Sequence, residues 1–109
     1  DAAVEANGGG DTNKWAIGVD SDQYDLVPED QQAVILTSML KRVDVAVYGA
    51  IEEFNSGNLE GGVTSFDLEA GGVDYSTSGG YIDDIKDDLD ELRDQIISGD
   101  IEVPITPEG

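Results

Sequence analysis

Charged side chains follow two apolar segments of the chain, and these residues are the first candidates for chemistry. Asp20 and Asp22 come after the apolar run 15–19, and Lys41 comes directly after the run 34–40. An ionised carboxylate offers only hydrogen-bond acceptors, and an ammonium group offers only donors. Hydrogen bonds to such charged groups are short and strong. The pattern therefore suits the binding of a polar small molecule, with hydroxyl donors meeting the carboxylate.

Composition argues against several other kinds of chemistry. The 109 residues include no Cys and no His, which excludes a disulfide, a thiol nucleophile, a Cys-based zinc site and a His-dependent triad. The 25 acidic and 5 basic residues leave a net charge of −20, which repels nucleic acids and anionic membranes. No cofactor-binding motif is apparent. An enzyme that uses paired carboxylates ranks last, because no pair stands out among the acids.

The acidity itself has two interpretations. Acids spread along the whole chain indicate a halophilic source, because molar salt screens their mutual repulsion. The alternative is a stand-alone acidic α/β domain that binds a basic protein or Ca²⁺. The spacing of Asp20, Asp22 and Asp25 resembles a calcium loop only in part, because an EF-hand needs Gly at the sixth position and Glu at the twelfth. Those positions hold Asp25 and Gln31, so no metal site is predicted.

Apolar periodicity and glycine positions predict the elements that must position these residues. They are a helix ending at residue 7, strands at 15–19, 34–40, 63–68, 73–75 and 101–105, and helices at 43–56 and 81–97. The strands 63–68 and 73–75 are expected to form a hairpin-like pair. A continuous helix over 31–56 remains an alternative, because an apolar run alone does not distinguish the two.

Buried strands followed by helices predict an α/β fold with a mostly parallel sheet. In such sheets, ligands bind at the carboxyl ends of the strands, which is where Asp20 and Lys41 lie. No apolar run reaches the ~20 residues that span a bilayer. Residues 1–7 have the pattern of a helix that lacks its beginning, so we expect the chain to be a piece of a longer protein.

Four segments together resemble the basic membrane protein family of substrate-binding lipoproteins of ABC transporters, which includes purine nucleoside receptors. The segments, in the family's order, are 15–23 (WAIGVDSDQ), 35–47 (ILTSMLKRVDVAV), 57–62 with 71–73 (GNLEGG and GGV), and 96–104 (IISGDIEVP). Each motif is weak alone, and the four in register are fairly specific. The resemblance implies a type I periplasmic-binding-protein fold, in which two α/β lobes enclose the ligand. Residues 1–109 would form a single partial domain within the C-terminal lobe.

The resemblance also implies roles for individual residues. Asp20 corresponds to the family's aspartate at a strand end, which is expected to accept hydrogen bonds from ribose hydroxyls. Lys41 corresponds to the lysine of the family's Thr-Ser-x-x-Lys motif, which is expected to reach the ligand. Asp22 is a weaker ligand candidate. The implied protein is a non-catalytic, extracytoplasmic receptor that binds a nucleoside and a permease, held at the membrane by a lipid anchor outside this chain.

Each of these residues also has a plainer structural interpretation. Asp20 would be a solvated carboxylate or loop cap, and Lys41 would pair with a nearby acid such as Asp44. Asp22 would shape the loop after the strand by bonding to backbone N–H groups. Ser38, inside an apolar run, is expected to bond locally.

Overall fold

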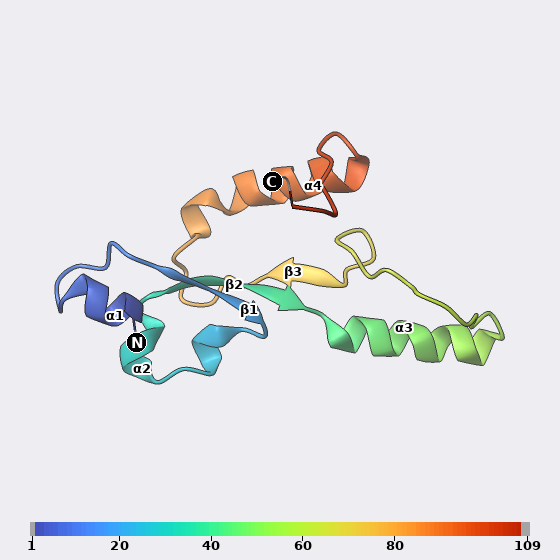
Figure 1. Ribbon diagram of the computed structural model, residues 1–109, viewed down its shortest axis with the longest axis horizontal. Helices are drawn as coiled ribbons and strands as arrows, with labels where there is room; N and C mark the ends of the chain where they lie inside the picture. Colours follow the sequence, from blue (N-terminus) through green and yellow to red (C-terminus); the bar gives the residue numbers. More distant parts are fainter. Residues whose placement is uncertain (1, 108–109) are drawn as a thin grey trace.

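The fold is that of a computed structural model, which describes residues 2–107 (Figure 1). Asp1 and residues 108–109, which the predicted single domain includes, lie outside the described residues. The elements are α1 (Ala2–Asn7), β1 (Ala16–Asp20), the 3-10 helix η1 (Gln23–Asp25), α2 (Glu29–Gln32), β2 (Ile35–Lys41), α3 (Val43–Ser56), β3 (Val73–Tyr75), the 3-10 helix η2 (Asp83–Ile85) and α4 (Lys86–Ser98). The predicted α/β class is confirmed.

The three strands form one sheet in the order β1-β2-β3. β1 pairs parallel with β2, whereas the shorter β3 pairs antiparallel with β2, so the sheet is mixed. Lys41, the last residue of β2, is the register partner of Val73, the first residue of β3. A parallel β3 would need a connection that returns to the start of β2. α3 instead extends away from the sheet (Figure 1). β3 therefore begins beside the last residue of β2 and runs antiparallel to it.

The strand-to-helix interpretation of residues 34–56 is confirmed, and the continuous-helix alternative is wrong. β2 ends at Lys41, Arg42 separates the two elements, and α3 begins at Val43. α3 ends at Gly57, whose φ of 77° is the left-handed conformation that glycine adopts without a steric penalty. Residues 35–41 satisfy their backbone groups in the sheet, so the helix starts only where the β-ladder ends.

Two predicted strands are absent, and one helix begins later than predicted. Residues 63–68 alternate in polarity but have no strand partner, so β3 pairs with β2 and no hairpin forms. Residues 101–105 are also irregular, and Pro104 could not donate a ladder hydrogen bond. The predicted helix 81–97 begins at Lys86 as α4, after η2. Alternation alone does not make a strand, because a strand also needs a neighbour for its backbone.

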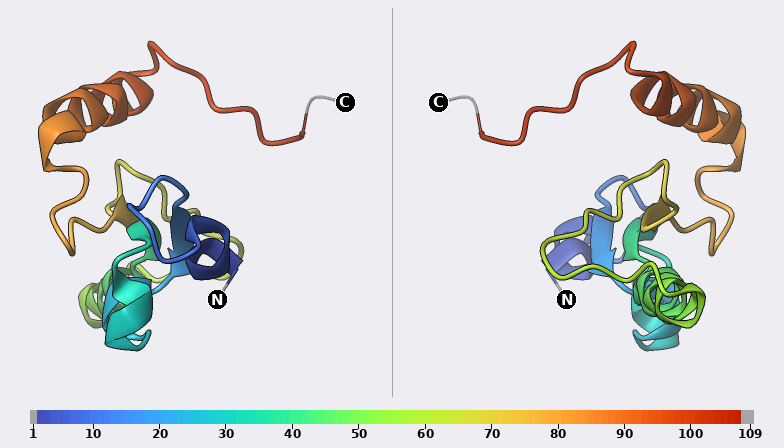
Figure 2. Two further views of the ribbon diagram at one scale, coloured as in Figure 1. Left: turned by 90° about the vertical axis from the view of Figure 1, so that its left-hand side faces the viewer. Right: turned by 90° about the vertical axis from the view of Figure 1, so that its right-hand side faces the viewer.

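A polar network joins α4 to β3. The Tyr75 hydroxyl donates to Asp90 Oδ1 at 2.6 Å, and Lys86 Nζ lies 2.7 Å from Asp90 Oδ2. Arg93 contacts an acid on each element: its NH2 lies 3.1 Å from Asp90 in α4, and its NH1 lies 3.5 Å from Asp74 in β3. These contacts hold α4 on the side of the sheet opposite α2 and α3, as Figure 2 shows.

We expect the phenol of Tyr75 to titrate above its ordinary pKa of 10.0, because its hydrogen bond to ionised Asp90 favours the neutral phenol. A pKa raised by folding means that the contact stabilises the fold fully below the unfolded-state pKa. That stability is lost as the pH rises through the folded-state pKa. The tyrosinate absorbance of the parent minus that of Tyr75→Phe reports this group. An Asp90→Asn background that leaves the difference curve unmoved would contradict the expectation.

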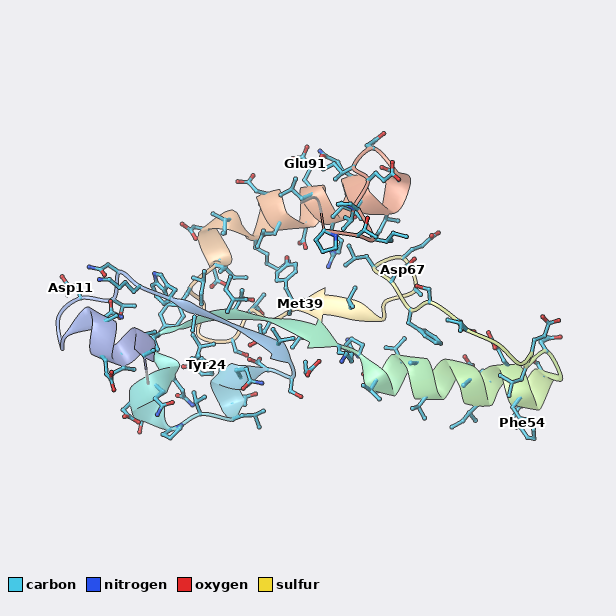
Figure 3. All side chains as sticks on the ribbon, in the orientation of Figure 1. Asp11, Tyr24, Met39, Phe54, Asp67 and Glu91 are labelled. Carbon is cyan, nitrogen blue, oxygen red and sulfur yellow. The ribbon has the colours of Figure 1, made fainter. Side chains whose placement is uncertain are left out.

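Much apolar surface is left uncovered by the described residues. The radius of gyration is 17.4 Å and the extents are 57 × 31 × 30 Å, whereas a compact domain of this length has a radius of gyration of about 13 Å. Val43, Val47, Ile51 and Phe54 form an apolar stripe along α3. This stripe is solvent-exposed, from 54% at Val47 and Ile51 to 69% at Phe54. Phe54 lies at the end of α3 far from the sheet (Figure 3). The buried hydrophobic residues of the described part are Val34, Ile35 and Ile82, a small core.

The net charge of −20 predicts a salt-dependent stability. Raising KCl from 0.1 to 1 M shortens the Debye length from ~10 to ~3 Å, which weakens long-range repulsion among the carboxylates. The same salt also screens exposed ion pairs, but each of those is worth only about 0–1 kcal/mol. We therefore expect the melting temperature of the protein to rise as KCl is raised from 0.1 to 1 M. Sucrose, which is excluded from protein surfaces but does not screen charge, is the control, and a rise no larger than in sucrose would contradict the repulsion argument.

None of the helices formed by residues 2–107 is long and apolar enough to cross a membrane.

Candidate functional site

The carboxyl ends of β1 and β2 bring Asp20 and Lys41 together. Because the two strands run parallel, both end at the same edge of the sheet, with Asp20 beside Leu40 in register. Lys41 Nζ lies 2.8 Å from Asp20 Oδ1, and each side chain is 63% exposed. The predicted placement of this pair at one sheet edge is therefore what the structure has, and both charges can be reached from solvent.

The plainer interpretation of Lys41, in which it pairs with a nearby acid, matches the structure, but the acid is Asp20 and not Asp44. Asp44 instead accepts from Arg42, whose Nε lies 3.0 Å from Oδ1 and whose NH2 lies 2.7 Å from Oδ2. The hydrogen bond from this guanidinium, together with its charge, lowers the pKa of the Asp44 carboxyl to about 2. Arg42 also fixes the start of α3, because its backbone N–H donates to Gly72 O at 2.9 Å. Lys41 therefore pairs with Asp20.

Asp20 has an unusual backbone conformation. Its φ is 75°, and within the described residues it is the one non-glycine residue with a positive φ. This left-handed conformation costs an L-residue roughly 1–2 kcal/mol, though Asp tolerates it better than most. The Ser21 N–H then donates to Val19 O at 3.1 Å, so the chain turns sharply as soon as β1 ends. Strain of this kind is common at functional sites.

Asp22 sits in the loop that follows and makes three hydrogen bonds. Its Oδ1 accepts from the Tyr24 N–H at 3.2 Å, which confirms the predicted loop-shaping bond. Its Oδ2 accepts from the Ser76 and Ser78 hydroxyls, both at 2.5 Å. Partial burial acts to raise the pKa of this carboxyl, but the hydrogen bonds from the two serines and the Tyr24 N–H outweigh it, so the pKa lies below its ordinary value.

The same loop packs on the face of the sheet. Ser38 is fully buried and accepts from the Gln23 N–H at 3.0 Å. This corrects the expectation that Ser38 bonds locally, since its partner is fifteen residues away. Gly18 makes room for the contact, because a Cβ there would overlap Gln23 Cγ and Ser38 Oγ.

The described residues have other polar and apolar features besides the Asp20–Lys41 pair. The acids on and before α4 are exposed apart from Asp90, which hydrogen bonds with Tyr75 and is half-buried. In the part of the chain that the structure describes, no group of three or more acids is placed to hold a metal ion. A hollow of about 370 Å³ lies between α4, β3 and the segment around Asp67, which Figure 3 labels. Val73, the register partner of Lys41, is one of the residues that line this hollow.

The serine partners of Asp22 were not among the predicted site residues. Ser76 and Ser78 follow β3 directly, as Asp20 and Lys41 follow β1 and β2. A polar run after a third predicted strand was the available signal. Their distance from Asp22 along the chain, 54 and 56 residues, gave no reason to link them.

A family model described as "ABC transporter substrate-binding protein PnrA-like" (Bmp) matches residues 2–106, nearly the whole chain. The chain belongs to this family. The resemblance inferred from the four sequence segments is thereby confirmed. The match spans both strand ends and the loops that surround the Asp20–Lys41 pair.

Individual curated proteins are similar to most of this chain. A "CD4+ T-cell-stimulating antigen" of Listeria monocytogenes is 35% identical over 100 residues, which are 85% of this chain and 28% of that protein. The "ABC transporter nucleoside-binding protein BmpA" of Lactococcus lactis is 31% identical over 96 residues, which are 83% of this chain and 27% of that protein. The chain thus spans less than a third of the length of these relatives.

A solved structure shares the fold of this Bmp chain. The crystal structure of ABC transporter system solute-binding proteins from Aeropyrum pernix K1 matches with a TM-score of 0.60 and 27% identity. The match covers 95% of this chain and 36% of that one. The mixed sheet with flanking helices is therefore part of a solute-binding-protein fold.

Proposed function

We propose that this chain supplies part of the ligand site of a substrate-binding protein that feeds an ABC importer, and that the ligand is a nucleoside. The observation that carries the proposal is the solvent-exposed pair of Asp20 and Lys41 at the carboxyl ends of two parallel strands, with their atoms 2.8 Å apart. Ligands of open α/β sheets bind at this edge. The role that we propose is binding and not catalysis, which the description of the matching family as substrate-binding proteins supports.

The chemistry of the pair fits a ribose ring. An ionised carboxylate has free acceptor positions on both oxygens, and two vicinal hydroxyls can donate to them together. Only Asp20 Oδ1 is occupied, by Lys41 Nζ. The ammonium group has three donors and uses one of them on Asp20, so it can also donate to a ligand oxygen. The pair therefore offers acceptors and donors side by side.

The rest of the site is expected to come from outside these residues. The family description and the printed name of the BmpA relative support a solute-binding role and a nucleoside as the solute. The uncovered apolar stripe of α3 supports a larger fold in which this chain is part of a C-terminal lobe. Ligand would favour the closed arrangement of two lobes. An ABC permease would then recognise that form outside the cytoplasm, where a lipid anchor would hold the receptor.

A thermal-shift series on the whole protein in molar KCl tests this proposal. Adenosine, guanosine, inosine and uridine are compared with free ribose. A ligand at 100 times its Kd should stabilise the fold by about 2.7 kcal/mol, which is readily seen as a rise in Tm. A rise with nucleosides and not with ribose is expected. If no nucleoside shifts the Tm while another class of small solute does, the nucleoside assignment is wrong and the binding role stands.

A further inference from the structure

Asp22 links two loops that are far apart in the sequence. One is the loop after β1, residues 21–25, and the other is the loop after β3, residues 76–80. Oδ1 of Asp22 accepts within its own loop, from Tyr24, whereas Oδ2 accepts from Ser76 and Ser78 across 54 and 56 residues. The carboxylate therefore acts as a clamp between the two loops.

The clamp closes onto the central strand. The Ser76 N–H donates to Ser38 O at 2.9 Å, and the Thr37 hydroxyl donates to Ser76 O at 2.6 Å. The Ser38 hydroxyl in turn accepts from Gln23, next to Asp22. Both loops are thus tied to the middle of β2 as well as to each other. Among residues 2–107, no buried side-chain polar atom lacks a partner, and a fully satisfied network of this kind is rigid.

We propose that Asp22 is a positioning residue that, through Ser76 and Ser78, holds the left-handed backbone of Asp20 and so aims the Asp20 carboxylate at Lys41 and the ligand. This inference rests on the proposed function. Asp20 lies two residues before Asp22, at a φ of 75° that an L-residue does not prefer. The direction of the chain after Asp20 must therefore be imposed. The Ser21 N–H and the Gln23 side-chain amide both donate to Val19 O and act locally, and the clamp anchors this turn to Ser76 and Ser78.

The geometry argues for this role over direct contact with a ligand. Both oxygens of Asp22 are already occupied, and the side chain is half-buried. Three of the about four acceptor positions of this carboxylate are filled by protein groups, and one of those groups, Ser76, is itself anchored to β2. Asp20, by contrast, has one partner and is 63% exposed. Asp20 is thus exposed for contact with a ligand, whereas Asp22 holds Asp20 in place.

Hydrogen exchange of the whole protein tests the clamp without any ligand. Asp22→Ala is expected to speed amide exchange about tenfold or more in both loops, since the hydrogen bonds of a carboxylate are lost. The matched control is Asp25→Ala, which removes an exposed carboxylate three residues further on in the same loop. Unchanged exchange over residues 76–80 in Asp22→Ala would overturn the proposal.

Adenosine binding by the same variants tests the consequence for Asp20. Asp22→Ala should weaken the Kd about tenfold in the parent and less than about twofold in an Asp20→Ala background, since a residue acting through Asp20 has nothing left to position. Additive losses would overturn the proposal. Asp22→Asn keeps the acceptor for Tyr24 and gains an amide that the serine hydroxyls can accept from, so exchange and Kd should both stay near the parent. An Asn variant with parent-like exchange but a lost Kd would instead identify Asp22 as a ligand contact.

The hydrogen-exchange and adenosine-binding experiments distinguish a failure of the proposed function from a failure of the positioning role. If the parent binds neither adenosine nor the other nucleosides, the nucleoside assignment fails, and the exchange of residues 76–80 still decides whether Asp22 clamps the loops. If the parent binds adenosine but the Asp22 variants behave like Asp25→Ala, the function stands and the positioning role is wrong.

Discussion

Replacing Asp20 by asparagine is expected to weaken nucleoside binding to the whole protein by about tenfold to a hundredfold. Losing hydrogen bonds to a charged group costs roughly 1.5–3 kcal/mol, and each 1.4 kcal/mol is a factor of ten in Kd. Asparagine is the informative replacement because it also tolerates the left-handed φ of 75° found at this position. It keeps one acceptor oxygen but loses the negative charge and replaces the second oxygen with an amide donor, so two ribose hydroxyls can no longer donate to two separate charged oxygens.

Asp20→Ala is expected to weaken binding at least as much, and it also strains the backbone. Isothermal titration with the tightest-binding nucleoside measures both variants, and Asp25→Asn is the control for removing one negative charge. Both Asp20 variants should keep most of their stability, because the ion pair with Lys41 is 63% exposed on each side and such pairs contribute about 0–1 kcal/mol. An Asp20→Asn protein that binds as tightly as the parent would remove Asp20 from the site.

The sequence predicted the parts of this site that depend on local pattern. Apolar runs ending in charged residues marked the ends of β1 and β2, and parallel pairing then required Asp20 and Lys41 to share a sheet edge. The break between β2 and α3 was visible because helical spacing begins only at Val43. Each of these inferences needs only neighbours within a few residues and the general geometry of α/β sheets.

The remaining features depend on contacts that no local pattern contains. Residues 63–68 alternate in polarity as a strand does but have no strand partner. Whether such a segment forms a strand depends on the neighbour that it packs against. The hydrogen bonds that Asp22 accepts from Ser76 and Ser78 join residues more than fifty positions apart. Asp90 is one acid among 25, and only the placement of β3 beneath α4 gives it Tyr75 as a partner.

Gly18→Ala is expected to be the most destabilising small substitution near the site. Gly18 lies in the middle of β1, and an added Cβ would overlap Gln23 Cγ and Ser38 Oγ and would lie 2.8 Å from Gln23 Cβ. Ser38 cannot retreat, because it is fully buried in β2. The strain is relieved only if η1 lifts off the sheet, which breaks the bond from Gln23 to Ser38. Overpacking of this kind typically costs about 1–3 kcal/mol.

Chemical denaturation of the whole protein measures this loss, and Gly61→Ala is the matched control. A Cβ at Gly61 meets nothing within 4 Å, and Gly61 is not among the glycines with a positive φ. That substitution should be neutral or slightly stabilising, because alanine lowers the entropy of the unfolded chain. Since η1 begins three residues after Asp20, lifting it should also loosen Asp22 and weaken nucleoside binding. Equal stabilities for the two variants would mean that the loop does not pack against the sheet at Gly18.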